Sequence, residues 1–181
     1  MGLYQATVAI TVGIFMMLAM GLNIITGYTG QVSLGHAAFF GIGAYTSALL
    51  SVKAGMSFWL ALPIAAAVTA AIGAILGAIS TRLHDDSLAI TTIGINFVVV
   101  SVFQYTQFFG GALGVGGIEY PSVLGRTLTK PEYLIVVVVC VLLGIWFDRR
   151  LVRSWLGLAL RAVGQNEEAA ESLGVPSAKF K

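Results

Sequence analysis

The sequence has little charge and almost no cysteine. Asp, Glu, Lys and Arg make up 10% of its 181 residues, whereas a soluble domain of this size has about 25%. That leaves too little polar surface to keep such a domain in solution. Because 57% of the residues are hydrophobic, intrinsic disorder is excluded as well. The single cysteine, Cys140, cannot form an internal disulfide, and its apolar surroundings favour a small packed side chain.

Other absences narrow the function. The sequence has no G-x-x-x-x-G-K-[ST] or G-x-G-x-x-G pattern, so we expect no ATP-binding P-loop. The two histidines, His36 and His84, lack cysteine or paired carboxylate partners, which argues against a metal site. No nucleophile triad or acid pair appears, and a net charge of +2 does not indicate nucleic acid binding. We therefore expect a protein that is not an enzyme and has no cofactor, metal or nucleic acid partner.

The sequence is rich in hydrophobic runs of membrane-spanning length. A spanning helix needs about 20 mostly apolar residues, and a single segment in lipid satisfies its backbone groups only as a helix. We therefore predict an all-α, polytopic transmembrane helical bundle of about five spans, in contact with membrane lipid. The predicted segments are, approximately, Gln5–Ile25, Ala37–Val52, Phe58–Ser80, Leu88–Phe109 and Tyr133–Phe147.

Charge divides the chain in two. Residues 1–147 are the predicted membrane region, and residues 148–181 hold ten of the eighteen charged residues. With five spans, Arg82 and the residues from Arg149 onward share one side, with seven of the ten Lys and Arg. The positive-inside rule places that side in the cytoplasm. We expect a multi-pass protein with a cytoplasmic C-terminus.

Polar residues interrupt the apolar segments at two places. The uncharged, glycine-rich stretch Gly27–His36 predicts either irregular backbone at membrane depth, beside protein or a water-filled path, or a tight interfacial turn. Thr92, Asn96 and Gln107 fall near one face of the fourth segment, where they either join helices or line a solute path. The candidates for a translocation path are Tyr28, Gly30, Gln31, Ser33, His36, Thr92 and Asn96.

Small residues recur every four positions along the third segment. This spacing predicts close packing against another helix, because it lets backbones approach in lipid. The residues form two stripes: Thr69, Gly73 and Gly77, and Ala66, Ala70, Ala74 and Ala78.

The charged C-terminal segment predicts a short helix over Glu167–Leu173. Asn166 is a favourable N-cap, two acidic residues follow it, Gly174 suits the C-terminal end and Pro176 prevents continuation. Because a helix this short is not stable alone in water, it needs a docking surface on its own membrane region or on a second protein.

These residues also carry a resemblance. Glu168–Ala170 followed by Gly174 resembles the E-A-A-x-x-x-G motif of bacterial ABC importer permeases. The strings at residues 157–163 and 21–45 are similar to the branched-chain amino acid permeases, in particular the LivM-like branch. The resemblance covers most of the sequence.

The resemblance implies a permease subunit of an ATP-driven importer in the bacterial inner membrane. A periplasmic binding protein would deliver leucine, isoleucine or valine to a pair of permease subunits, and cytoplasmic ATPase subunits would bind the ATP. The E-A-A helix would dock in a groove on the ATPase. The implied coupling residues are Glu167, Glu168, Ala169, Ala170 and Gly174. Urea and short-amide permeases look similar, so the substrate stays open.

The length departs from the family pattern. Members continue beyond the E-A-A loop with several more spans, whereas this sequence stops at Lys181. We expect either a truncated permease or a chain whose remaining helices come from another subunit. A non-transporting membrane fragment that serves as an assembly partner is the alternative function.

Overall fold

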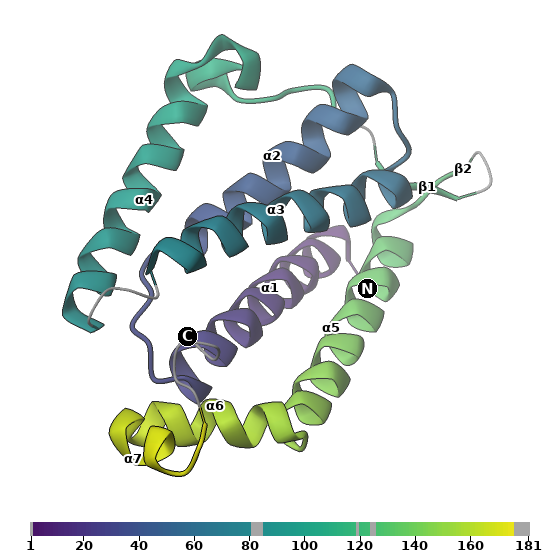
Figure 1. Ribbon diagram of the computed structural model, residues 1–181. Helices are drawn as coiled ribbons and strands as arrows, with labels where there is room; N and C mark the ends of the chain where they lie inside the picture. The colour runs from purple at the N-terminus through teal and green to yellow at the C-terminus, as the bar shows by residue number, and fades with distance from the viewer. Residues whose placement is uncertain (1, 81–84, 119, 124–125, 176–181) are drawn as a thin grey trace. The chain divides into compact units, whose positions relative to one another are not determined.

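The protein is described by a computed structural model that covers residues 2–80, 85–118, 120–123 and 126–175 (Figure 1). Helices dominate it, which confirms the predicted fold class, and the sheet in these residues is one antiparallel pair of two-residue strands. The elements are α1 (Leu3–Leu22), the π-helix η1 (Asn23–Tyr28), α2 (His36–Ala54), α3 (Phe58–Ser80), α4 (Asp85–Tyr105), the 3₁₀ turns η2 (Gln107–Phe109) and η3 (Gly111–Leu113), β1 (Ser122–Val123), β2 (Arg126–Thr127), α5 (Lys130–Val152), α6 (Trp155–Gln165) and α7 (Glu167–Ser172).

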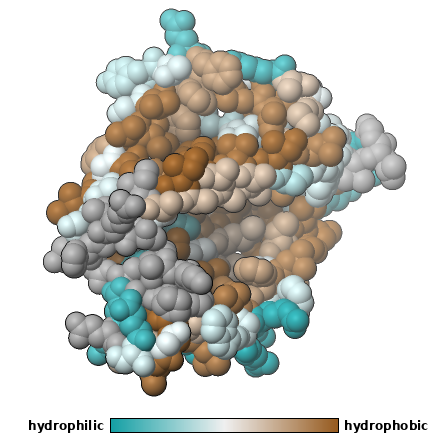
Figure 2. Space-filling view, in the orientation of Figure 1, coloured by the Kyte–Doolittle hydropathy of each residue, from teal (hydrophilic) through white to brown (hydrophobic). Residues whose placement is uncertain are grey.

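Four helical segments in the described residues have the length and composition of a membrane span. They are Leu3–Tyr28, His36–Ala54, Phe58–Ala78 and Ser87–Tyr105. These match the first four predicted segments. The fifth forms the 23-residue helix α5 but is not among the four. Large apolar side chains such as Phe15, Phe97 and Leu142 lie exposed on the helices, and hydrophobic residues cover much of the visible surface (Figure 2). Such a surface suits lipid rather than water.

The chain divides into two compact units, residues 1–33 with 129–181 and residues 34–128. In the first unit α1 packs lengthwise along α5. Gly13 faces Val137, and a Cβ on Gly144 would lie 3.0 Å from Met20 Cε. Because the contacts advance along both helices together, α1 and α5 run in the same direction.

The first unit turns a sharp corner between α5 and α6. The Ser154 hydroxyl caps α6 by accepting a hydrogen bond from Gly157 N–H at 3.3 Å. A Cβ on Gly157 would lie 2.7 Å from Val152 Cα, so only glycine fits inside the corner. Figure 1 shows α6 crossing the ends of α1 and α5.

In the second unit α2 packs antiparallel to α3. Gly43 lies against Thr69, and Gly73 lies against Phe39. Thr69 and Gly73 therefore confirm one predicted stripe as a packing face, although Gly77 has no neighbour within 4 Å of a Cβ. The same face is continued by the buried residues Ala61 and Ala65. The members of the second predicted stripe, Ala66, Ala70, Ala74 and Ala78, are exposed.

Helix α4 runs alongside α2, and the rings of Tyr45 and Phe103 stack with centroids 4.0 Å apart. The prediction that this segment continues as helix to Phe109 is wrong, because α4 ends at Tyr105. The chain reverses at Gly110, whose φ of +84° ends the 3₁₀ turn η2. Gln107 belongs to η2, so it does not share the helical face of Thr92 and Asn96.

Candidate functional site

The irregular stretch predicted at Gly27–His36, between the first two segments, is present and is called the break below. The last turns of the first helix widen into the π-helix η1, and Thr29–Gly35 has no helical or strand structure before α2 begins at His36. A Cβ on Gly27 would lie 3.0 Å from Asn23 Cγ, so glycine suits the widened turn. π-Helical turns are rare and often lie at functional sites. The break is therefore the first element of the candidate site.

Two glycines hold the start of the break against α6. Gly30 has a φ of +72°, and a Cβ there would lie 3.0 Å from the carbonyl oxygen of Gly164. A Cβ on Gly164 would in turn lie 2.7 Å from the carbonyl oxygen of Tyr28. Backbone therefore packs directly on backbone. The contact joins the string at residues 21–45, which carries part of the family resemblance, to the residue directly after the string at 157–163.

Tyr28 adds polar contacts to the same junction. Its hydroxyl donates a hydrogen bond to Asp148 Oδ2 at 3.1 Å, at the end of α5. The guanidinium carbon of Arg161, on α6, lies 5.2 Å from the centre of the Tyr28 ring, which is within range of a cation–π interaction. Asp148 Oδ1 is buried without a hydrogen-bond partner among the described residues. Tyr28 thus ties the break to the end of α5 and to α6.

The end of the break is held by α4. Leu34 N–H donates to Thr92 Oγ1 at 3.1 Å, and that hydroxyl donates to Ala89 O at 2.9 Å. A Cβ on Gly35 would lie 2.9 Å from Thr92 O. Thr92 is 8% exposed. Its single hydrogen is engaged within α4 and its oxygen supports the break, so Thr92 acts here as a joining residue.

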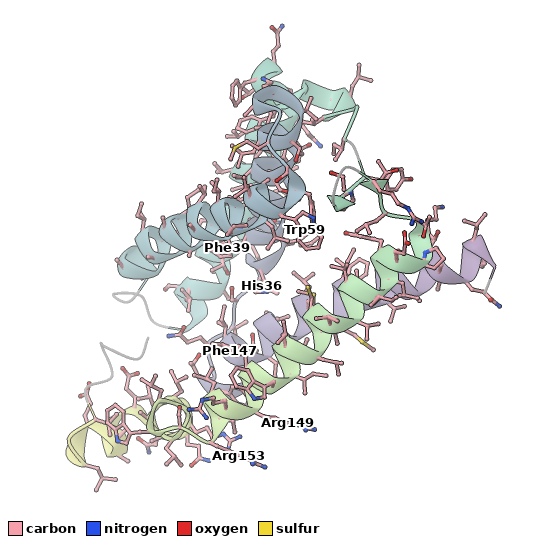
Figure 3. The ribbon with its side chains drawn as sticks, turned by 90° about the vertical axis from the view of Figure 1, so that its right-hand side faces the viewer. His36, Phe39, Trp59, Phe147, Arg149 and Arg153 are labelled. Carbon is pink, nitrogen blue, oxygen red and sulfur yellow. The ribbon has the colours of Figure 1, made fainter. Side chains whose placement is uncertain are left out.

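The remaining path candidates are half-buried. This group consists of Gln31, Ser33, His36 and Asn96. Figure 3 shows His36 at the start of α2, with Phe39 one turn further along that helix. Of the seven candidates, the contacts above link Tyr28 and Gly30 to α5 and α6, and Thr92 to the backbone of the break.

The predicted C-terminal helix forms as α7. Asn166 Oδ1 accepts a hydrogen bond from Ala169 N–H at 3.0 Å, as expected of the N-cap. At the other end Gly174, with a φ of +82°, donates to Glu171 O at 2.9 Å, and Val175 N–H donates to Ala170 O at 3.0 Å. These two bonds form a Schellman motif. The helix and both of its caps are therefore confirmed, with Leu173 as C-cap. Pro176 lies outside the described residues.

The predicted coupling residues divide between the inside and the outside of α7. Ala170 is 2% exposed and packs inside the chain, whereas Ala169 and Gly174 are exposed and Glu167 is half-buried. Glu168 belongs to α7, and its side chain lies outside what the structure describes. Ala169 and Gly174 are thus accessible to a partner, and Ala170 holds the helix in place.

Sequence reasoning missed Asp148, Arg161 and Gly164 as parts of this junction. The first two were interpreted only as cytoplasmic charges. A carboxylate placed directly at the end of an apolar helix was the available signal, because such a group needs a partner when it is partly buried. Gly164 offered no signal by itself. Its contact with Gly30 depends on the path of the chain between them.

Comparisons with known proteins agree with the motif strings. A family profile described as branched-chain amino acid transport system / permease component matches residues 4–181. The high-affinity branched-chain amino acid transport system permease proteins LivM of Salmonella typhimurium and Escherichia coli strain K12 are each 32% identical to this chain over 193 aligned positions. The alignments cover 93% of this chain and 45% of each relative, so the chain spans about half the length of the curated relatives it matches. No solved structure matches.

Proposed function

The chain belongs to the branched-chain amino acid transport system permease family, and on that premise we propose that it is a membrane subunit of an ATP-driven importer of branched-chain amino acids. The match over residues 4–181 is the observation that carries the proposal. The names of the relatives support the substrate class. Two cytoplasmic ATP-binding subunits, a second permease subunit and a periplasmic solute-binding protein are the proposed partners, in the inner membrane.

The packing of α1 against α5 supports five spans. Because these helices run in the same direction, both begin on one side of a membrane. The chain leaves α1 on the opposite side and must return an odd number of times, and three candidate spans lie between the two helices. α5 is then the fifth span. The break, α6 and α7 share the side on which the excess of Lys and Arg favours the cytoplasm.

The break lies at the cytoplasmic mouth of the solute path in this proposal. At about 1.5 Å per residue, the 26 residues of Leu3–Tyr28 exceed a hydrocarbon core of about 30 Å. The break therefore begins at the end of a span. Its last part contacts Thr92, which is about 8 Å along the candidate span that starts at Ser87. Gln31 and Ser33, which lie between the two anchors in the sequence, are the path candidates of the break.

The helix with the proposed ATPase contacts, α7, is connected to the break through α6. The proposed ATPase contacts are Glu167, Glu168, Ala169 and Gly174 on α7, while Ala170 packs inside the chain. Helix α7 follows α6 directly, and Gly164 of α6 packs on Gly30. A displacement of α7 by the ATPase is therefore transmitted over a rigid backbone contact to the mouth of the path.

Co-purification with the ATPase subunit tests the proposal. Glu168→Lys and Gly174→Pro should each abolish the complex. Glu119→Lys and Gly117→Pro are the matched controls, since Gly117, like Gly174, has a positive φ and no neighbour within 4 Å of a Cβ. Complexes retained in both α7 variants contradict the coupling role.

Uptake of labelled leucine by the assembled complex in proteoliposomes tests the transport role. Competition by unlabelled leucine, isoleucine and valine, but not by urea or acetamide, is the expected result. A stable complex without uptake contradicts transport and leaves the assembly role.

A further inference from the structure

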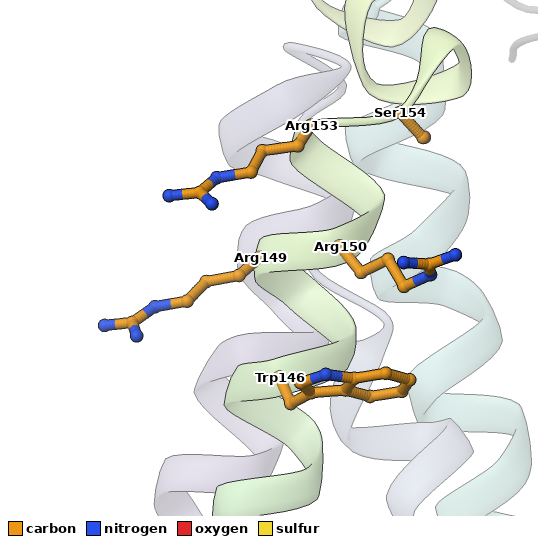
Figure 4. A pocket seen from close by; sticks show the side chains of 5 residues that line it. All are labelled: Trp146, Arg149, Arg150, Arg153 and Ser154. Carbon is orange, nitrogen blue, oxygen red and sulfur yellow. The ribbon is translucent and has the colours of Figure 1, made fainter.

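Three arginines line a pocket at the corner between α5 and α6. The pocket has a volume of about 480 Å³ and is lined by Trp146, Arg149, Arg150, Arg153 and Ser154 (Figure 4). Arg149 and Arg153 extend from one side of α5, and Arg150 extends from the other side, one turn beyond Trp146. Figure 3 shows the side chains of Arg149 and Arg153 extending outward at the C-terminal end of α5.

The positive charge of this corner is not neutralised within the described part of the chain. None of the three arginine side chains forms an ion pair or hydrogen bond there. Asp148, the adjacent acid in the sequence, is bonded to Tyr28 instead. The N-terminus of the 11-residue helix α6, capped by Ser154, adds partial positive charge to the same pocket. The site therefore favours an anion.

Apolar side chains flank the arginines on both helices. Trp146 is 60% exposed on the last apolar turn of α5, and tryptophan is enriched where a span meets the lipid headgroups. Beyond the corner, α6 exposes Trp155 and Leu158 at 67% and 63%. Because α6 crosses the ends of α1 and α5 (Figure 1), it lies along the surface of a membrane that these helices cross, as interfacial helices with exposed apolar residues do.

We propose that this corner binds the phosphate group of an anionic phospholipid, with the acyl chains against Trp146 and the exposed side chains of α6. Guanidinium groups form bidentate hydrogen bonds with phosphate oxygens, and basic clusters directly beyond a span attract anionic lipids. The site is independent of which solute the protein carries. It would fix the corner from which α6 and α7 extend.

Native mass spectrometry of the full 181-residue chain in detergent tests the site, with phosphatidylglycerol and phosphatidylcholine as probes. Phosphatidylglycerol should bind more tightly. A basic residue near an anionic surface contributes on the order of fivefold in affinity, so Arg149→Gln, Arg150→Gln and Arg153→Gln combined should weaken phosphatidylglycerol binding by at least about tenfold and leave phosphatidylcholine unchanged.

Two further variants distinguish specific lipid binding at the pocket from attraction by the net positive charge of the protein. The control Lys53→Gln, Arg126→Gln and Lys130→Gln removes three positive charges elsewhere and should keep the lipid preference. Replacing the three pocket arginines by lysine keeps the charge but removes the planar donors, and should give intermediate affinity. Circular dichroism of each variant in detergent checks that the helices remain.

Three results would overturn the proposal. The first is equal binding of the two lipids by the unaltered chain. The second is an equal loss of affinity for phosphatidylglycerol in the pocket variant and in the charge-matched control, which would show that net charge alone attracts the lipid. The third is displacement of phosphatidylglycerol by millimolar inorganic phosphate but not by chloride at the same ionic strength, which assigns the pocket to the free anion.

Discussion

Gly164→Ala should loosen the junction between α6 and the break. The added Cβ would lie 2.7 Å from Tyr28 O and 2.8 Å from the carbonyl carbon of Thr29, whereas ordinary contacts begin at 3.4 Å. The neighbouring atoms are backbone, so no side chain can rotate away. Overpacking of this kind costs about 1–3 kcal/mol. Alanine recovers at most about 1 kcal/mol of helix propensity, and less at this position because α6 ends at Gln165.

The net cost of about 1–2 kcal/mol raises the fraction of open junction about 5–30-fold. Hydrogen–deuterium exchange of the purified chain in detergent measures this opening. Amides in the second half of α6, and that of its C-cap Asn166, which donates to Ala162 O, should exchange faster by that factor. Gly94→Ala is the matched control, because a Cβ there has no neighbour within 4 Å and α4 should keep its exchange rates.

Unchanged exchange across α6 in Gly164→Ala would refute the close backbone contact. Equal acceleration in Gly94→Ala would refute it as well, since the effect would then come from adding any methyl group. Gly30, which packs on Gly164 and has a positive φ, gives an independent check. Gly30→Ala forces alanine into the left-handed region, at roughly 1–2 kcal/mol, and should accelerate the same amides.

Three smaller changes test the other contacts. Thr92→Val removes the acceptor of Leu34 N–H and should cost about 1–3 kcal/mol, measured as a lower unfolding midpoint; a midpoint equal to that of the unaltered chain would contradict the anchor. Tyr28→Phe removes the hydrogen bond to Asp148 at a cost of about 0.5–1.5 kcal/mol. It should accelerate proteolysis at the end of α5 and leave the hydrogen–deuterium exchange of the α4 amides unchanged. Asn166→Ala removes the N-cap of α7 at about 1 kcal/mol; exchange in α7 should rise, and an unaltered rate would show that the cap is dispensable.

Features set by neighbouring residues could be predicted from the sequence. The hydrophobic runs located α1 to α4, since span length follows from membrane thickness. Helix α7 was predicted with both caps, because an N-cap asparagine and a C-terminal glycine act within one turn. The end of α4 was predicted too late, because Phe108 and Phe109 continue the apolar pattern while the turn is set by Gly110.

Contacts between distant segments could not be predicted. Tyr28 and Asp148 are 120 residues apart, and no local pattern pairs a tyrosine with one particular carboxylate. The glycines of the break suggested irregular backbone, but not which helix would support it. The two small-residue stripes of α3 looked equivalent in the sequence, but the stripe with Thr69 and Gly73 is the one that packs on α2 in the described residues, whereas the alanine stripe is exposed. Choosing between them needs the position of α2.

Thiol labelling at Ser33 tests most directly whether the break joins the solute path to the ATPase. In a Cys140→Ala background, Ser33→Cys would be reacted with a membrane-impermeant maleimide from the cytoplasmic side of the complex, with and without ATP. The predicted result is labelling that is rapid in one nucleotide state and slowed in the other. In membranes that contain the Glu168→Lys chain, which should not bind the ATPase, the labelling rate should not respond to ATP. Phe15→Cys, which replaces an exposed residue of α1, should stay unlabelled throughout. A rate at Ser33→Cys that is the same with and without ATP would contradict the account.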